Sequence, residues 1–238
     1  MTDQSSTNRP VCIVTGAGSG IGRAIAQHIS RHARIVIAGR RVDPLLETGS
    51  TLGNEQSDWI AVQADITRDQ DRQQIVEQAV EHFGRIDHLV NNAGLGTSGL
   101  LCNLDERQIA QLIDVNLTAP IALTRLAMPK IIESRGTVIS IGSRAAIDPF
   151  PGLGVYGCAK SGIEGLARAI TNEYGQQGVR SYTVHPGAVE TAMLRSIISK
   201  EQLPTDQVLT PDDIAGVVVD CILGQREEPS GSAILVSR

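Results

Sequence analysis

The feature that most constrains the fold is a glycine-rich turn between an apolar run and an amphipathic segment near the start of the chain. Residues Val11–Thr15 are apolar or β-branched, and residues 16–22 read Gly-Ala-Gly-Ser-Gly-Ile-Gly. Glycines allow a tight turn and a close approach of the backbone to a pyrophosphate, and a helix after the turn directs its N–H groups at that anion. The pattern therefore predicts a strand, a phosphate-binding turn and a helix. The residues expected to bind the phosphates are Gly16, Ser19, Gly20, Ile21 and Gly22.

Short apolar runs and longer helical patterns alternate along the rest of the chain. The expected strands are Val11–Thr15, Arg34–Ala38, Trp59–Ala64, His88–Asn91, Thr137–Ile141, Ser181–Val184 and Ala233–Val236. The expected helices are Ile21–Arg31, Asp69–Phe83, Glu106–Ile132, Val155–Gln176 and Pro211–Leu223, and Glu190–Thr210 is read as irregular. Alternating strands and helices give parallel βαβ units with right-handed crossovers. The sequence therefore predicts an α/β fold, a Rossmann-like doubly wound parallel sheet of about seven strands with helices on both faces.

Length and composition bound the domain organisation and the environment. The chain has 238 residues, so residues 10–238 are expected to form a single domain, with residues 1–9 as a disordered, polar lead-in. A net charge of −5 without a basic run argues against a nucleic-acid partner. No apolar run approaches the ~18 residues of a membrane span. Four cysteines without CxxC spacing are typical of reduced thiols, which predicts a cytoplasmic protein.

The end of the second expected strand indicates which dinucleotide is bound. A carboxylate at this position would hydrogen-bond the 2′-hydroxyl of the adenosine ribose. Here the strand ends in Ala-Gly and is followed by Arg40 and Arg41. Guanidinium groups form charge-assisted hydrogen bonds with a 2′-phosphate. The sequence therefore predicts NADP(H) as the cofactor in preference to NAD(H), the alternative being two solvated surface arginines.

Two residues near the start of an expected helix have the spacing of an acid/base pair. Tyr156 and Lys160 are four residues apart, so their side chains lie on one face of the helix. The phenol has an ordinary pKa of about 10, and a neighbouring ammonium would lower it. A surface pair with this spacing is common in any helix, so the interpretation depends on the residues around it.

Two further polar residues are candidates for the same site. Ser143 follows the expected strand Thr137–Ile141, where its hydroxyl would bind a substrate oxygen and stabilise developing alkoxide charge. Asn116 falls in the middle of an expected helix, where a buried amide needs a partner. We expect its side chain to hold a water that connects Lys160 to solvent. His28 and His32 are also four apart, but no third ligand is near them, and no metal site is expected.

Together these residues resemble the short-chain dehydrogenase/reductase family in its common form of about 250 residues, over nearly the whole chain. The motifs that carry the resemblance are Thr15-Gly16-x-x-x-Gly20-Ile21-Gly22, Asp65-Ile66, Asn91-Asn92-Ala93-Gly94, Asn116, Ser143, Tyr156-x-x-x-Lys160 and Pro186-Gly187-x-Val189-x-Thr191. The resemblance implies that Asn116, Ser143, Tyr156 and Lys160 form a catalytic tetrad. It implies cofactor contacts from Asp65 and Ile66 near the adenine, Asn92, Ala93 and Gly94 along the dinucleotide, Tyr156 and Lys160 at the nicotinamide ribose, and Pro186, Gly187, Val189 and Thr191 at the nicotinamide. It also implies a homodimer or homotetramer.

These observations predict an NADP(H)-dependent oxidoreductase that interconverts a ketone or aldehyde and an alcohol, with a small-molecule substrate and no membrane partner. The alternative enzyme is a 3-oxoacyl-thioester (acyl-carrier-protein) reductase, and the rival class is a non-catalytic NADP-sensing protein, for which the tetrad has no use. Apolar residues near the expected nicotinamide predict a mainly apolar substrate. The substrate contacts expected are Leu95, Phe150, Leu153, Met193 and Leu194, and His185 either contacts the substrate or packs.

Overall fold

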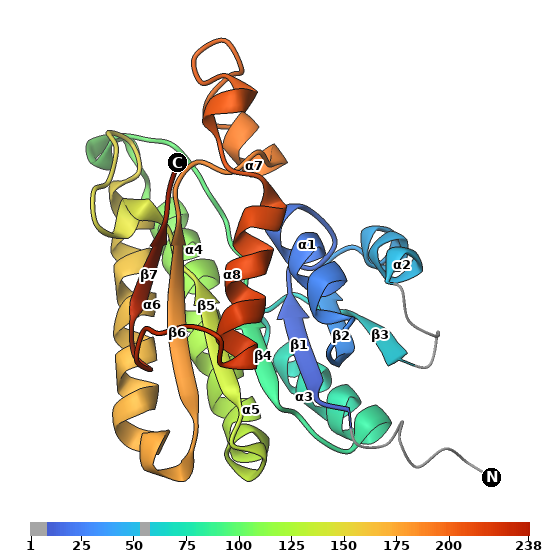
Figure 1. Cartoon of the computed structure of the whole chain (residues 1–238). Coiled ribbons are helices and arrows are strands. Elements are labelled where there is room, and N and C mark those ends of the chain that lie inside the picture. Colours follow the sequence, from blue (N-terminus) through green and yellow to red (C-terminus); the bar gives the residue numbers. More distant parts are fainter. Residues whose placement is uncertain (1–8, 53–57) are drawn as a thin grey trace, which may run out of the picture.

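The computed structural model describes residues 9–52 and 58–238, which form a seven-stranded parallel sheet covered by helices (Figure 1). The sheet order is β3-β2-β1-β4-β5-β6-β7. The strands are β1 Val11–Thr15, β2 Arg34–Gly39, β3 Trp59–Gln63, β4 His88–Asn91, β5 Thr137–Ile141, β6 Arg180–Pro186 and β7 Ala233–Val236. The helices are α1 Gly20–Ile29, α2 Val42–Thr51, α3 Asp69–Phe83, α4 Glu106–Ile113, α5 Ala119–Ser134, α6 Gly154–Tyr174, α7 Ala192–Arg195 and α8 Pro211–Leu223.

The central strand β1 shows why the sheet has two cores. Successive side chains of a strand point to opposite faces. Val11 and Ile13 belong to the core on one face, whereas Cys12 and Val14 belong to the core on the other. All four are fully buried. A strand buried on both faces has to be apolar throughout, which is why β1 does not alternate apolar and polar residues.

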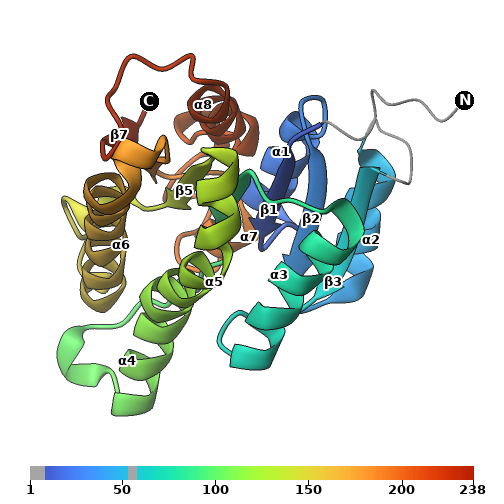
Figure 2. The same ribbon diagram turned by 90° about the horizontal axis from the view of Figure 1, so that it is seen from below.

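The helices divide between these two faces (Figure 2). Helices α1 and α8 cover one face, where Ile25 and Val218 lie in the same core as Cys12. Helices α3, α5 and α6 cover the other, where Ile75, Ile131 and Ile170 pack. The strand order reverses between β1 and β4, which are neighbours in the sheet, since β1–β3 extend to one edge and β4–β7 to the other. In such a sheet the crevice for a ligand lies at the carboxyl ends of the strands beside this switch point. The predicted fold class is confirmed.

The expected helix Glu106–Ile132 is two helices. A π-helical turn of five residues, Asp114–Thr118, separates α4 from α5. Such a turn adds a residue to the helical repeat and is found mostly at functional sites. The periodicity of the sequence does not reveal it, because the apolar pattern continues through the turn.

Helix α2 was not expected from the sequence. It contains Pro44 and Gly49, both poor helix formers, and Arg41 at its N-cap provides no side-chain cap. Tertiary packing explains the helix, since the Trp59 ring fills the space beside Gly49. A Cβ atom at Gly49 would lie 2.3 Å from that ring.

The segment read as irregular, Glu190–Thr210, also contains regular structure. Helix α7 is capped by Thr191, whose hydroxyl accepts a hydrogen bond from the Leu194 amide at 3.2 Å. A single parallel bridge joins Val189 to Leu209, so the two ends of the segment lie side by side. The segment therefore forms a closed flap at the carboxyl end of the sheet (Figure 1).

Other differences from the expected elements are small. Strand β6 continues to Pro186, and α1 ends at Ile29 rather than Arg31. The expected lead-in lies outside the described residues except for Arg9, which pairs with Asp58 at 2.6 Å. Within residues 9–52 and 58–238, no helix combines the length and the apolar character needed to cross a membrane.

Candidate active site

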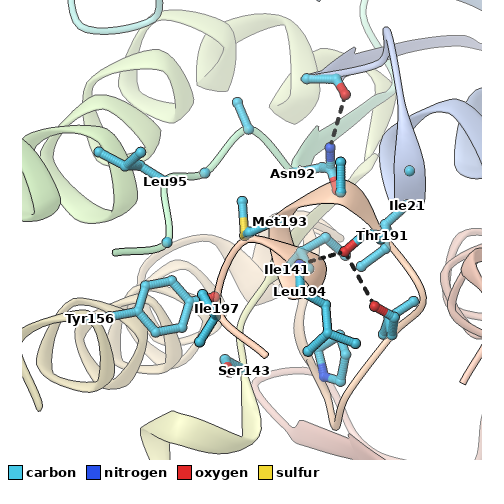
Figure 3. A pocket seen from close by; sticks show the side chains of 18 of the residues that line it. Ile21, Asn92, Leu95, Ile141, Ser143, Tyr156, Thr191, Met193, Leu194 and Ile197 are labelled. Carbon is cyan, nitrogen blue, oxygen red and sulfur yellow. Dashed lines mark hydrogen bonds between the residues drawn. The ribbon is translucent and has the colours of Figure 1, made fainter. Parts of the chain in front are cut away.

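A cavity of about 1350 Å³ lies at the carboxyl ends of the strands (Figure 3). Its walls come from the segments after β1, β2, β3, β4, β5 and β6, together with α6 and α7. Every candidate residue from the sequence lines this cavity except Asn116 and His185. Residues far apart in the sequence thus meet in one place, as expected for an open α/β sheet.

The glycine-rich turn forms one end of the cavity. Gly16 and Gly20 have φ values of +66° and +53°, a conformation that favours glycine. A Cβ atom at Gly22 would lie 2.4 Å from the Gly16 carbonyl oxygen, so α1 packs against the turn without space for a side chain. Ser19 occupies the N-cap of α1 and makes no capping hydrogen bond with its side chain. The first N–H groups of α1 are therefore available to an anion.

The turn is fixed to the segment after β4 by two residues. The Thr15 hydroxyl accepts hydrogen bonds from the Asn92 and Ala93 amides, both at 3.0 Å. The Asn92 side chain donates back to the Thr15 carbonyl oxygen at 2.8 Å. Because both switch-point strands end at these contacts, hydrogen bonds between side chains and backbone hold the floor of the cavity.

The arginines after β2 lie at the same end of the cavity as Asp65. Arg40 and Arg41 are exposed and line the cavity. Partial burial raises the pKa of Asp65, but hydrogen bonds from Thr67 and the charge of Arg40 outweigh it and hold the pKa below its usual value. Asp65 is therefore ionised, and it accepts from the Thr67 amide at 3.0 Å and hydroxyl at 2.8 Å.

The three polar residues at the other end of the cavity lie together. Ser143 follows β5, and its hydroxyl lies close enough to Tyr156 on α6 to oppose the rise in the phenol pKa. Lys160 is one turn further along α6, with its ammonium 5.6 Å from the centre of the Tyr156 ring. The helix thus presents Tyr156 and Lys160 on one face toward the end of β5, as their spacing predicts.

The electrostatics of this group differ from the expectation that Lys160 lowers the pKa of Tyr156. Burial raises the pKa of Tyr156, and the hydrogen bond from Ser143 only partly opposes that rise. The ammonium of Lys160 instead donates to the Ile141 carbonyl oxygen at 2.8 Å. Burial also lowers the pKa of Lys160 to about 8. Desolvation is thus the largest effect on the phenol, and it acts in the opposite direction to the lowering expected from Lys160.

The Asn116 side chain makes hydrogen bonds that the sequence did not predict, and its expected contact with a water stays a prediction. Asn116 is fully buried in the π-helical turn. Its amide oxygen accepts from the Leu95 N–H at 3.1 Å, and its amide nitrogen donates to the carbonyl oxygens of Leu95 at 2.8 Å and Leu112 at 2.9 Å. Both ends of the amide are therefore used to hold the segment after β4. Gly94 lies between this amide and Lys160, since its Cβ would be 3.0 Å from the Asn116 oxygen and 3.6 Å from the Lys160 ammonium.

His185 does not contact the cavity, so of the two alternatives left open by the sequence it packs. The side chain is fully buried, and its Nδ1 atom lies against the backbone of Ser143. His28, which the sequence analysis considered together with His32, pairs with Asp212 at 2.9 Å. Among the described residues, no group of three or more His, Cys, Asp or Glu side chains is placed to hold a metal ion.

The flap that follows β6 supplies wall residues that the sequence did not reveal. Leu95, Phe150, Leu153, Met193 and Leu194 line the cavity as expected, and Ile197, Ile198 and Leu203 line it in addition (Figure 3). These three lie in the segment read as irregular, and only the apolar spacing after Thr191 could have indicated them. The flap touches the opposite wall, because a Cβ at Gly96 would lie 3.2 Å from Met193 and 3.3 Å from Ile197.

Comparison with known proteins identifies the family. The family model described as short chain dehydrogenase matches residues 10–202. The chain belongs to this family. An uncharacterized oxidoreductase of Listeria monocytogenes is 32% identical to it over 89% of this chain and 90% of that protein. A 3-oxoacyl-[acyl-carrier-protein] reductase of Thermotoga maritima is 30% identical over 88% of each chain.

A solved structure supports the same assignment for this short-chain dehydrogenase. The crystal structure of a 3-ketoacyl-(acyl-carrier-protein) reductase from Brucella melitensis, complexed with NADH, superposes with a TM-score of 0.88. It is 27% identical, and the match covers 96% of both chains. The resemblance stated from the motifs is therefore confirmed, and the chain is an oxidoreductase of this family.

Proposed function

We propose that the protein is an NADP(H)-dependent oxidoreductase that interconverts a carbonyl compound and an alcohol, with Tyr156 as general acid and base. The observation that carries the proposal is the grouping of Ser143, Tyr156 and Lys160 in a cavity continuous with the glycine-rich turn. An intact acid/base group inside a dinucleotide-sized cavity argues against a protein that only senses NADP.

The residues at the glycine-rich end fit a dinucleotide. A side chain at Gly16 would fill the space beside the turn, because its Cβ atom would lie 2.9 Å from Ala93. Ser19, Gly20, Ile21 and Gly22 would hold the pyrophosphate, with Asp65 and Ile66 near the adenine. Asn92, Ala93 and Gly94 would lie along the dinucleotide, and Pro186, Gly187, Val189 and Thr191 beside the nicotinamide. When bound, the cofactor supplies or accepts the hydride at the carbonyl carbon.

Each polar residue then has a separate task in carbonyl reduction. As the C=O π bond breaks, its electron pair moves to oxygen, and the Tyr156 phenol gives its proton to that oxygen. Ser143 donates a hydrogen bond to the same oxygen and stabilises its developing charge. Lys160 supplies positive charge one helical turn away and would bind the nicotinamide ribose. Asn116 holds the wall after β4 in place through Leu95. In oxidation the same proton moves in reverse.

Arg40 and Arg41 support NADP(H) over NAD(H). Both are exposed at the cavity, where a 2′-phosphate would form charge-assisted hydrogen bonds with them. The relative from Brucella melitensis is complexed with NADH, so the preference needs a direct test. Titration of the protein with NADPH and NADH should give tighter binding of NADPH, and equal affinities would contradict this assignment.

The alternative activity is reduction of a 3-oxoacyl thioester on an acyl-carrier protein. It is supported by the names of two relatives and by two exposed arginines at the cavity, Arg107 and Arg144. The exposed apolar side chains Phe150 and Met193 suit an acyl chain as well as a simple ketone. A screen of ketones, aldehydes and acetoacetyl thioesters, followed at the NADPH absorbance band, would distinguish the two. A carrier-bound thioester turned over far faster than any free carbonyl would favour the alternative.

We further propose that the protein is cytoplasmic and forms a homodimer or homotetramer. Apolar residues on the outer elements support association, since Leu235 on β7 is 50% exposed and Ile121 on α5 is 42% exposed. Light scattering coupled to size-exclusion chromatography would measure the assembly, and a monomer would contradict it.

A further inference from the structure

A buried histidine lies directly behind one of the proposed catalytic residues. His185 on β6 is fully buried. Its Nδ1 atom lies 3.0 Å from the Ser143 backbone nitrogen and 2.8 Å from the Ser143 carbonyl oxygen. Polar side chains this deeply buried need partners, and this ring finds its partners on the backbone of a residue whose hydroxyl faces the cavity.

The backbone before Ser143 is shaped around the same ring. A Cβ atom at Gly142 would lie 2.4 Å from the Nδ1 atom of His185. The Gly142 amide also donates to the Val184 carbonyl oxygen at 2.7 Å. The peptide between Gly142 and Ser143 is therefore confined by β6 on this side, and the ring is the only side chain of β6 that bonds to Ser143 among the described contacts.

Helix α6 supplies a third partner on the far side of the ring. Tyr156, Lys160 and Glu164 follow one another at intervals of four residues, so they form one stripe along the helix. Glu164 places a carboxylate oxygen 3.4 Å from Nε2 of His185, without the geometry of a hydrogen bond. The same carboxylate also pairs with Arg168. The stripe that carries the proposed acid/base pair thus continues to the histidine.

The charge of Glu164 determines which ring nitrogen carries the proton. A carboxylate accepts hydrogen bonds and repels a lone pair, so it favours the tautomer with the proton on Nε2. Nδ1 is then an acceptor for the N–H of Ser143, and the Ser143 carbonyl oxygen instead accepts from the Ala146 amide at 2.9 Å. Burial lowers the pKa of His185, although the Ser143 backbone and Glu164 oppose that shift, so the ring is neutral at neutral pH. A doubly protonated ring would donate to the Ser143 carbonyl and leave the N–H without its acceptor.

We propose that His185 is a positioning residue for the reaction, which fixes the backbone of Ser143 and so aims its hydroxyl at Tyr156, with Glu164 setting the tautomer. The inference rests on the proposed function, in which the Ser143 hydroxyl binds the substrate oxygen. The Ser143 side chain itself has few restraints, since the hydrogen bond recorded for its oxygen among the described residues comes from the Ala145 amide at 3.1 Å. Rotation of the 142–143 peptide would carry the hydroxyl with it.

The test compares His185→Val with His185→Asn in steady-state kinetics with NADPH and a verified carbonyl substrate. Valine removes the acceptor, and kcat should fall about 10- to 100-fold, the scale of displacing a reacting group by about 1 Å. Asparagine places its amide oxygen near the position of Nδ1 and should recover most of that loss. His185→Gln, whose amide reaches the Nε2 position instead, should not. The dissociation constant of NADPH should stay unchanged in all three variants, because His185 does not line the cavity.

A double-mutant cycle with Ser143→Ala isolates the route of the effect. If His185 acts through the Ser143 hydroxyl, His185→Val should lower kcat in the native background and have little further effect in the Ser143→Ala background. Val184→Ala is the matched control, since Val184 is a fully buried neighbour on β6 in the hydrophobic core. It should lower the melting temperature and leave kcat unchanged.

The outcomes separate this inference from the proposed function. Undiminished turnover in Ser143→Ala would contradict the role proposed for Ser143 in the reaction. Reduced turnover in Ser143→Ala with full turnover in His185→Val would overturn only the inference. An equal loss from His185→Val in both backgrounds, or no recovery with asparagine relative to glutamine, would also overturn it. If the valine variant does not fold, the asparagine and glutamine variants carry the comparison.

Discussion

Polar groups at the two ends of the sheet are used differently. At the carboxyl ends, Ser143 and Tyr156 lie together and face a cavity. At the amino ends, Asp87 accepts from the Val11 amide at 2.8 Å and from both sides of the Arg85 guanidinium, at 2.8 and 2.6 Å. The first set keeps hydrogen-bonding capacity for a ligand, whereas the second is consumed within the protein.

Arg180 is a second charged residue at the amino end whose hydrogen bonds are made within the protein. Its guanidinium donates to the Thr137 hydroxyl at 3.1 Å and to the carbonyl oxygens of Cys221 at 3.2 Å and Ile222 at 2.8 Å. These bonds tie the start of β6 to the start of β5 and to the end of α8. Substitutions at the amino end should therefore change stability, and substitutions at the carboxyl end should change chemistry. Each prediction below tests that division.

The largest effect is expected for Tyr156→Phe. The substitution removes only the hydroxyl and keeps the packing of the ring, so turnover should fall about 10²-fold or more while the melting temperature and NADPH affinity stay near the native values. Burial raises the pKa of Tyr156, so the phenol is the protonated acid that reduction needs at neutral pH. Oxidation needs the phenolate and should speed up as pH rises. Near-native turnover of the phenylalanine variant on a verified substrate would refute the mechanism.

The opposite result, a change in stability without a change in turnover, is expected for His88 at the amino end. This side chain begins β4, and its Nδ1 atom has no hydrogen-bond partner among the described residues. Burial lowers its pKa from 6.5 to about 4. The unfolded chain therefore binds a proton below pH 6.5 that the folded protein does not, and stability should fall by about 2 kcal/mol between pH 6.5 and pH 5.

Chemical denaturation of the native protein and His88→Gln at pH 7.5 and pH 5 would measure this effect. The glutamine variant should lose less stability on acidification, because it has no group to protonate. Its kcat at neutral pH should equal that of the native protein. A change in kcat without a change in the acid dependence of stability would break the division between the two ends.

The sequence predicted the carboxyl end better than the rest of the molecule, for a physical reason. Phosphate binding needs glycines at fixed places, such as Gly16 with its left-handed backbone and Gly22 without space for a Cβ, and few other residues meet those demands. Such requirements leave a visible pattern. The predicted strands follow for a similar reason, since strands buried on both faces are continuous apolar runs.

The features that the sequence did not reveal depend on contacts between distant segments. Helix α2 forms despite Gly49 because Trp59 covers it, and the role of Asn116 depends on its contact with Leu95. The rise in the Tyr156 pKa is a burial effect, which a spacing of four residues cannot indicate. His185 is the clearest case. From its position before Pro186 it could either contact the substrate or pack, and only the folded structure shows that its ring lies against the Ser143 backbone.

A smaller effect is expected at the adenine end of the cavity. Replacing both Arg40 and Arg41 with alanine should weaken NADPH binding about tenfold, through lost charge-assisted hydrogen bonds to the 2′-phosphate, and leave NADH binding nearly unchanged. Both side chains are exposed, so the melting temperature should not move. Arg31 is an exposed arginine that does not line the cavity, and Arg31→Ala is the matched control. Equal weakening of NADPH and NADH would assign the arginines a general electrostatic effect.

The smallest effect is expected at an ion pair that does not follow the division between the two ends. It lies at the carboxyl end, but its polar groups are bonded within the protein. Arg195 donates to Glu190 through Nε at 2.9 Å, and to the carbonyl oxygens of Ser199 at 3.2 Å and Leu203 at 2.8 Å. The hydrogen bond from Arg195 lowers the pKa of Glu190 to about 2, so the pair stays charged throughout the pH range of any assay. It holds the flap in which Ile197 and Leu203 line the cavity.

Arg195→Ala should therefore loosen the flap and raise the KM of the carbonyl substrate by about a few-fold, with a smaller change in kcat. The melting temperature should change little, because the pair lies outside both hydrophobic cores. Lys130→Ala removes a surface ion pair with Glu133 on α5, away from the cavity, and serves as the control for loss of a surface charge. A lower melting temperature with an unchanged KM would mean that partnered groups act on stability at either end of the sheet. In that case the division between the two ends follows from whether a polar group is satisfied within the protein, and not from where it lies.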